Sequence, residues 1–310
     1  MIRGYLYSLL AVVLWSANFV IANKASSAIA PIELAFYRWL VAFLCLLPFA
    51  ESAFVRGQDI FRDKGRIRRF LVTAITGVSA FNTLIYIAGK STPAVDLSLI
   101  AIASPAFIVN INSLVFRKRV RPVTWFGVAM AMVGCVWLIG TNDTSSLKDL
   151  RVSMGDILMV VASITFAIYT VLQRAPKGMA DEEYLFLLIF TGLLGLLPFY
   201  LLRVALYGWS PITLDTGLYI LYLGVFSSLV AFYLWNKSVK IIGAQKTGVS
   251  YYALPCFVYI IEYVMGGREV SMVVVGSFAL IFVGALVIHF TTTQAVESRT
   301  MASRTEADER

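Results

Sequence analysis

Ten stretches of mostly apolar sequence, each about 20 residues long, take up nearly the whole chain. An α-helix of roughly 20 residues crosses the hydrocarbon core of a bilayer, so each stretch can span a membrane. Composition excludes a water-soluble fold, because 59% of the 310 residues are hydrophobic and 14% are charged, against about 25% charged in soluble domains. We predict an all-α polytopic membrane protein with ten transmembrane helices. They are expected at residues 4–23, 31–49, 70–89, 94–116, 123–140, 155–173, 184–202, 218–236, 247–265 and 272–290.

An internal repeat of about 150 residues relates the two halves of the chain. Glu33 and the Leu-Leu-Pro-Phe sequence at 46–49 align with Glu183 and the same sequence at 196–199, and other blocks align in the same order. Because each half holds five helices, an odd number, the second half must enter the membrane with the opposite orientation. Inverted repeats of this kind are typical of secondary transporters, which hold the substrate between the halves. We expect repeats at 1–140 and 155–290, a linker at 141–154 and a disordered tail at 291–310.

Lysine and arginine are distributed unevenly between the two sides of the predicted membrane. Loops on the side of both termini contain 19 of them, and loops on the other side contain 6. The positive-inside rule therefore predicts cytoplasmic termini and an external linker. The basic runs at 62–69 and 117–121 are expected to lie against anionic lipid and not to bind nucleic acid. A signal peptide at 4–23 is disfavoured because this stretch has a counterpart in the middle of the chain. We predict a multi-pass protein of the cytoplasmic (inner) membrane.

Several short motifs occur in a characteristic order. The first helix contains Trp-Ser-x-Asn-Phe at 15–19, and the second begins with Pro-x-Glu-Leu-Ala-x-x-Arg at 31–38. The fourth and ninth helices each carry Pro-x-Phe, at Pro105 and Pro255, where we expect helix kinks. With the inverted halves, this order resembles the EamA-type ten-helix exporters of the drug/metabolite transporter superfamily. The resemblance implies a gradient-coupled transporter or exchanger of small metabolites, often of amino-acid type, with a central cavity between the halves. The partners it implies are a small-molecule substrate, a coupling proton in gradient-driven transport, and the lipid bilayer.

Two charged residues fall well inside predicted helices. Arg38 lies about seven residues from the outer end of the second helix, and Glu262 lies within the ninth. A charged side chain inside a bilayer is costly, so both are candidates for function. Arg38 either stabilises helix packing or holds a substrate carboxylate, while Glu262 either binds substrate or lies close enough to the helix end to reach water. Both belong to the outer half. If their faces meet, they could pair as an outer gate, or hold the carboxylate and the ammonium of a zwitterion between them.

Uncharged polar and aromatic side chains inside the helices complete the predicted site. Most intramembrane amides and hydroxyls join helices by hydrogen bonds, but those near aromatic residues have a better claim on a cavity. The predicted substrate-binding residues are Trp15, Asn18, Arg38, Asn82, Tyr86, Tyr169, Tyr233, Tyr251, Tyr252 and Glu262.

Other chemistries are disfavoured by what the chain contains. A single histidine and three cysteines without Cys-x-x-Cys spacing give no usual zinc site, and no nucleotide-binding glycine pattern is present. We therefore expect no metal, no cofactor and no enzymatic activity. The predicted function is export or exchange of a small polar or amphipathic metabolite, an amino acid or a derivative, by alternating access. The alternatives are transport of cationic metabolites or drugs and, less favoured, a membrane-embedded transferase.

Overall fold

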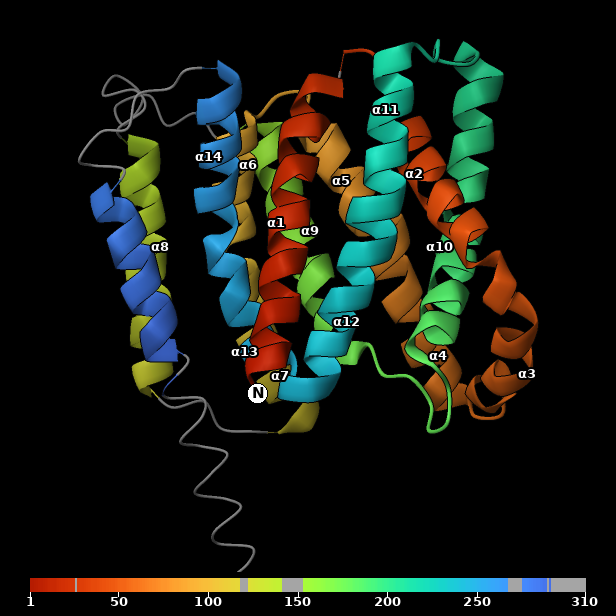
Figure 1. Cartoon of the computed structure of the whole chain (residues 1–310), viewed down its shortest axis with the longest axis horizontal. Helices are drawn as coiled ribbons and strands as arrows, with labels where there is room; N and C mark the ends of the chain where they lie inside the picture. The colour runs from red at the N-terminus through yellow and green to blue at the C-terminus, as the bar shows by residue number, and fades with distance from the viewer. Residues whose placement is uncertain (26, 118–121, 141–152, 267–274, 289, 291–310) are drawn as a thin grey trace, which may run out of the picture.

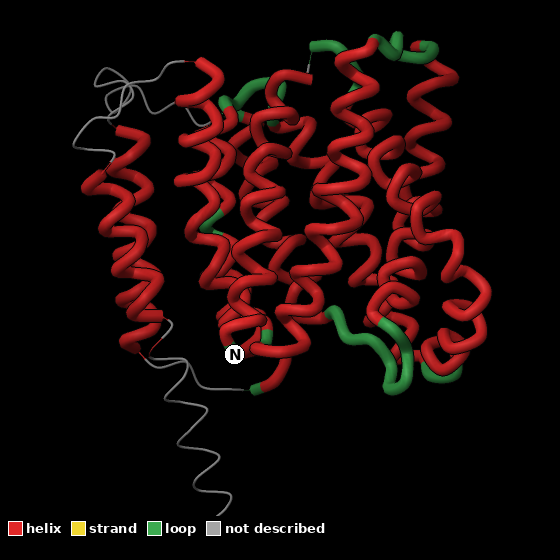
Figure 2. The backbone as a smooth tube through the Cα atoms, viewed as in Figure 1, coloured by secondary structure: helices red, strands yellow, loops and turns green. Residues whose placement is uncertain are grey.

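The chain is a bundle of roughly parallel helices (Figure 1). The computed structural model describes residues 1–25, 27–117, 122–140, 153–266, 275–288 and 290. Within them there is no strand (Figure 2). Eight helices are long and apolar enough to cross a membrane, and two shorter apolar helices, Pro122–Gly134 and Val275–Ile288, pack together at one side of the bundle. The predicted all-α polytopic fold is confirmed. The tail at 291–310 and nearly all of the linker at 141–154 lie outside the described residues.

Several membrane spans are built from more than one helical segment. In chain order the helices are α1 (Ile2–Ala25), α2 (Pro31–Leu46), α3 (Ala50–Phe61), α4 (Lys64–Ala74), α5 (Phe81–Ala88), α6 (Ala94–Ala101), α7 (Ser104–Phe116), α8 (Pro122–Gly140), α9 (Met154–Leu172), α10 (Asp181–Tyr207), α11 (Leu214–Tyr222), α12 (Ala231–Ile242), α13 (Ala244–Val249) and α14 (Leu254–Gly266). Short 3₁₀-helical segments, Leu47–Phe49 and Ser250–Ala253, join α2 to α3 and α13 to α14. Wider π-helical segments, Ile75–Ala80 and Leu223–Val230, join α4 to α5 and α11 to α12.

The interruptions occur at corresponding places in the two halves. The two π-helical segments contain Gly77 and Gly224, which the repeat aligns. The span that contains Pro105 is broken between α6 and α7, and the span that contains Pro255 changes to a 3₁₀ segment just before α14. Proline lacks the N–H that would continue the α-helical hydrogen bonding, so a break at the preceding turn is expected. The inverted repeat therefore extends to the irregular parts of the helices.

Most spans are longer than hydropathy predicts. The third begins at Lys64 instead of residue 70, because the side chain of Asp63 accepts a hydrogen bond from the N–H of Arg66 and caps the helix. The seventh runs through Asp181–Tyr207 with Pro198 inside it. Hydropathy marks only the part of a helix that lies in hydrocarbon, whereas capping residues decide where the helix ends. The predicted helices are correct in number and order, and the additional turns carry charged residues.

Two contacts between the halves organise the bundle. The antiparallel helices α2 and α10 pack along their length, as do α1 and α12. At the face where the N-terminus lies, which we call the N-face, the Arg56 guanidinium on α3 lies 3.4 Å from the Glu183 carboxylate at the start of α10. At the opposite face, Arg203 near the end of α10 lies 3.7 Å from Glu33 at the start of α2. Each glutamate is the repeat equivalent of the other, so the same type of ion pair closes both ends.

Candidate functional site

A buried arginine lies at the centre of a polar cluster. The Arg38 side chain on α2 is fully buried, and its Nε donates a hydrogen bond of 2.6 Å to the hydroxyl of Ser228. Its Nη1 donates to the side-chain oxygens of Asn18 (2.8 Å) and Asn82 (2.7 Å), and to the Tyr86 hydroxyl. The Tyr86 hydroxyl in turn donates to Asn18 over 2.9 Å. We call these five residues the Arg38 cluster; they come from α1, α2, α5 and a π-helical segment of the second half.

The Arg38 cluster brings together four of the predicted site residues but not Glu262. The helix that carries Arg38 packs on α5, α10 and Leu223–Val230, whereas α14, which carries Glu262, packs on α1 and α6. In this conformation the four hydrogen-bond partners of Arg38 are all uncharged. The two charges therefore do not form the gate that their similar depth suggested. Sequence gives the depth of a residue in the membrane, but not the direction in which its helix face points.

A cluster of aromatic rings adjoins the Arg38 cluster. Ring centroids of Trp15 lie 5.3 Å from Phe166, 5.3 Å from Phe232 and 5.1 Å from Trp235. The Trp15 indole N–H donates to the carbonyl oxygen of Ser227 over 2.9 Å. We call the following buried residues the aromatic cluster: Trp15, Phe166, Tyr169, Phe232, Trp235 and Tyr251. It contains three predicted site residues, Trp15, Tyr169 and Tyr251, and fills the space between the two halves.

A cavity of about 560 Å³ opens at the N-face of the bundle, next to the aromatic cluster. Its inner end contains Asn236, whose side-chain oxygen accepts a hydrogen bond of 2.5 Å from the Tyr169 hydroxyl. Residues of both halves line it, from Asn112 on α7 to Lys246 on α13. The Lys246 ammonium lies 3.8 Å from the sulfur of Met1, which places this N-face cavity at the end of the bundle where the chain begins.

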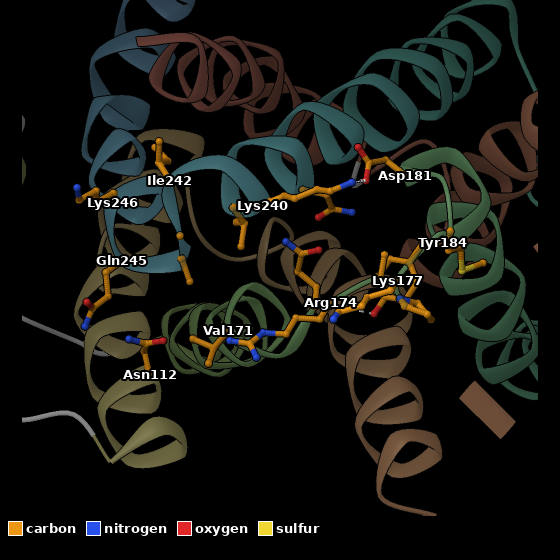
Figure 3. Close-up of a pocket in the computed structure, with 18 of the residues that line it drawn as sticks. Asn112, Val171, Arg174, Lys177, Asp181, Tyr184, Lys240, Ile242, Gln245 and Lys246 are labelled. Carbon is orange, nitrogen blue, oxygen red and sulfur yellow. Dashed lines mark hydrogen bonds and ion pairs between the residues drawn. The ribbon is translucent and has the colours of Figure 1, made fainter. Parts of the chain in front are cut away.

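Most of the charged residues that line the N-face cavity are cations. Figure 3 shows Arg174, Lys177, Lys240 and Lys246 around one hollow, from segments that are far apart in the sequence. Asp181 is the one carboxylate among the lining residues, and it forms an ion pair of 2.6 Å with Lys240. The remaining cations form no ion pair with a carboxylate in the described part of the chain. The cavity therefore favours negatively charged groups.

The three parts of the site follow one another along a single span. On the helix Leu214–Ile242, Ser228 belongs to the Arg38 cluster, Phe232 to the aromatic cluster, and Asn236 and Lys240 to the cavity. Each step is four residues, or about 6 Å. Inward from the N-face, the order along this span is therefore the cationic cavity, the aromatic cluster and the buried guanidinium.

The opposite face is closed by contacts between the halves. Between the halves, the Thr92 hydroxyl donates to the Asp156 carboxylate over 2.9 Å. Within the first half, the Asn23 amide nitrogen donates to the carbonyl oxygen of Gly89 over 3.2 Å. Asp156 also closes a capping box with Ser153 at the start of α9. Together with the ion pair of Glu33, these contacts seal the end of the bundle beyond the Arg38 cluster. Along this path, the described residues leave the cavity open at the N-face.

The other predicted site residues lie apart from this path. The Tyr233 hydroxyl donates to Glu182 over 3.0 Å and accepts from Lys237, at the edge of the N-face. Tyr252 lines a separate, largely apolar cavity of about 570 Å³ between α1, α14 and the last helix. Glu262 is half-buried on α14. No group of three or more metal-ligating side chains occurs in the part of the chain that the structure describes.

Sequence reasoning did not select the residues that line the N-face cavity. Arg174, Lys177, Lys240 and Lys246 were counted only as loop charges that set the orientation. The available signal was that they end two spans of the second half, 155–173 and 218–236, and begin a third. Consecutive spans cross the membrane in opposite directions, so these span ends lie at the same face and their charges gather there.

An inverted-repeat bundle with a cavity open to one face and a sealed opposite face is the architecture of a membrane transporter. The chain belongs to the EamA-like transporter family, which matches residues 2–140 and 153–290. Both repeats are therefore recognised separately, and the resemblance to EamA-type exporters is confirmed.

Individual relatives agree with the family. The chain is 24% identical to the uncharacterized transporter YyaM of Bacillus subtilis, over 87% of this chain and 88% of the relative. It is 27% identical to an uncharacterized transporter of Archaeoglobus fulgidus (84% and 88% covered). It is also 27% identical to a protein of Salmonella typhimurium named "Probable amino-acid metabolite efflux pump" (75% and 76% covered). A solved crystal structure shares the fold, with a TM-score of 0.71 at 21% identity over 94% of this chain and 98% of that one.

Proposed function

We propose that this protein exports or exchanges a small polar or amphipathic metabolite of amino-acid type across the cytoplasmic membrane by alternating access. The observation that carries the proposal is the N-face cavity, whose inner end at Asn236 adjoins the aromatic cluster, while contacts between the halves close the opposite face. A site that is reached from one side at a time is what alternating access requires. The name of the Salmonella relative supports the choice of an amino-acid metabolite as the solute.

The proposal places both termini in the cytoplasm, so the cavity faces inward. Labelling of single introduced cysteines tests this in a background without the native cysteines. Trp209 is 68% exposed at the connection between α10 and α11, and Lys64 is exposed at the N-face. In intact cells, Trp209→Cys is expected to react with an impermeant thiol reagent, and Lys64→Cys only after permeabilisation. The reverse pattern would show that the cavity faces outward.

Transport itself is tested with purified protein in proteoliposomes. Efflux or counterflow of labelled amino acids and their derivatives is measured together with the chemical identity of the solute on both sides. We expect solute to cross unchanged and without ATP. A covalent product in place of flux would instead identify a membrane-embedded transferase. A cationic dye is included as a competitor, because cationic drugs and metabolites are the alternative solute class.

A further inference from the structure

Resting on the proposed transport function, we propose that the solute is a small organic carboxylate with an apolar body and no compensating ammonium group, and that Arg38 and Asn82 bind its carboxylate. The protein would then select solutes by their negative charge.

The first observation is that the charge of Arg38 has no counter-ion in the cluster. Its partners are two amide oxygens and two hydroxyls, all neutral. A fully buried charge is normally paired with an opposite charge, because the loss of water around it is expensive. The rings of Trp39 and Tyr86, with centroids 5.2 Å and 5.7 Å from the Arg38 Cζ, supply only weak cation–π attraction. An anion is therefore the missing component.

The second observation is that donors remain unused at the same place. The Nη2 atom of Arg38 and the Nδ2 atom of Asn82 are buried and have no hydrogen-bond partner in the described part of the chain. Asn82 already accepts a hydrogen bond from Arg38 Nη1, so the two unused donors belong to side chains that are hydrogen-bonded to each other. A carboxylate has two acceptor oxygens, so it can accept from Arg38 Nη2 and from Asn82 Nδ2, and a hydrogen bond between ionised groups is the stronger kind. The four neutral acceptors orient the Arg38 side chain but do not supply the negative charge of a counter-ion.

The third observation concerns the path to Arg38. A solute from the N-face passes the N-face cavity, where Arg174, Lys177 and Lys246 form no ion pair with a described carboxylate. Cationic walls raise the local concentration of anions and lower that of cations. The buried aromatic cluster lies between this cavity and Arg38, and its rings favour contact with an apolar body. An ammonium group finds no unpaired carboxylate among the described residues that line this cavity, since Asp181 is already paired with Lys240.

A set of matched probes tests the selection of charge. N-acetylphenylalanine carries a carboxylate alone, phenylalanine carries both charges, and phenylalanine amide carries an ammonium alone; the same three forms of leucine vary the apolar body. Binding to the purified full-length protein is measured by calorimetry, and uptake is measured in proteoliposomes. We expect the N-acetyl compounds to bind best, the amino acids more weakly, and the amides not to compete. Equal or better binding of the amides, or binding by none of the probes, overturns the inference.

Substitutions test the assignment to Arg38 and Asn82. Arg38→Gln should weaken binding of the N-acetyl compounds by about 10- to 100-fold, the range for loss of a charge-assisted contact. Asn82→Asp places an internal carboxylate beside Arg38, so the protein should fold normally yet lose carboxylate binding to a similar degree. Arg203→Gln is the control, because Arg203 pairs with Glu33 at the sealed face and should leave binding unchanged. Unchanged binding in Asn82→Asp, with its melting temperature retained, overturns the assignment even if Arg38→Gln fails to fold.

The two proposals fail separately. Flux of cationic or neutral solutes without carboxylate binding would leave the transport function standing and remove the inference. Binding of carboxylates at Arg38, with no flux of any solute, would remove the transport function and leave an anion-binding site.

Discussion

The two halves of this transporter agree at their ends and differ in their middles. Glu33 and Glu183 each begin a helix and each pair with an arginine, one at either face. Halfway along the same helices the likeness stops, because the residue 150 positions after Arg38 is Leu188. Leu188 is fully buried in an apolar core. The shared ion pairs belong to the scaffold that both halves need, whereas the unmatched arginine breaks the symmetry between them.

The two amide neighbours of Arg38 follow the same rule. Asn18 corresponds to Tyr169 at an offset of 151, and Asn82 corresponds to Leu229 at an offset of 147. The first half thus contributes amides around a charge, and the second contributes apolar and aromatic side chains at the equivalent positions. A duplicated chain can retain its fold with either set. One polar and one aromatic side make an amphipathic site, which two identical halves could not provide.

The largest effect is expected when the difference between the halves is removed. Leu188→Arg places a second buried charge where no amide or hydroxyl cluster surrounds it, and should lower the free energy of unfolding by more than about 4 kcal/mol. Thermal unfolding in detergent, or monodispersity by size-exclusion chromatography, measures this. Leu188→Met is the control and should cost less than about 1.5 kcal/mol. A well-folded Leu188→Arg protein would show that the second half also tolerates a buried cation.

The next prediction concerns the two equivalent glycines of the π-helical segments. A Cβ atom at Gly224 would lie 2.5 Å from the Val41 Cβ and 3.0 Å from the Arg38 carbonyl oxygen, and one at Gly77 would overlap the Tyr169 ring. Gly224→Ala and Gly77→Ala should therefore each cost about 1–3 kcal/mol through overpacking.

Gly217 on α11 provides the matched control for these glycines. The nearest atom to a Cβ there is 4.0 Å away, so Gly217→Ala should be neutral or stabilise by up to about 1 kcal/mol, as alanine favours a helix. All three variants are compared by melting temperature. Equal melting temperatures would contradict the close approach of the halves at both π-helical segments.

A smaller effect should distinguish two tyrosines of the aromatic cluster. The Tyr169 hydroxyl donates to Asn236, so Tyr169→Phe should cost about 0.5–1.5 kcal/mol. The Tyr251 hydroxyl is buried without a hydrogen-bond partner in the described part of the chain, so Tyr251→Phe should be neutral or slightly stabilising. Chemical or thermal unfolding of the two variants side by side checks the order. The reverse order would indicate that Tyr251 has the stronger bond.

The smallest loss of stability is expected when the ion pairs at the two ends of the bundle are broken. Arg56 is 54% exposed, so Arg56→Gln should cost less than about 1 kcal/mol. Arg203 is 25% exposed and its partner Glu33 is fully buried, so Arg203→Gln should be the more costly of the two. Melting temperatures measure both, at low and at high salt. If Arg56→Gln proves more harmful, the N-face pair contributes more than its exposure implies.

Sequence predicts the fold well and locates the polar residues inside the spans, because both depend on local patterns. Apolar length locates the spans, and a charge or amide inside a span is conspicuous, as Arg38, Asn18 and Asn82 show. The pairing of Arg38 with neutral partners instead of Glu262 was not predictable, since it depends on the rotation of α2 and α14 about their axes. The N-face cavity was missed for a related reason: its cations become neighbours only when span ends from different parts of the chain meet.

The lack of a counter-ion at Arg38 also has an electrical consequence. A membrane potential acts on every charge inside the bilayer, by about 2.3 kcal/mol per elementary charge for each 100 mV crossed in full. When the empty protein changes from opening at one face to opening at the other, the positive charge of Arg38 moves through part of that field. A bound carboxylate cancels the charge, so the loaded protein makes the same transition with almost no electrical work. The potential would then act mainly on the return of the empty carrier.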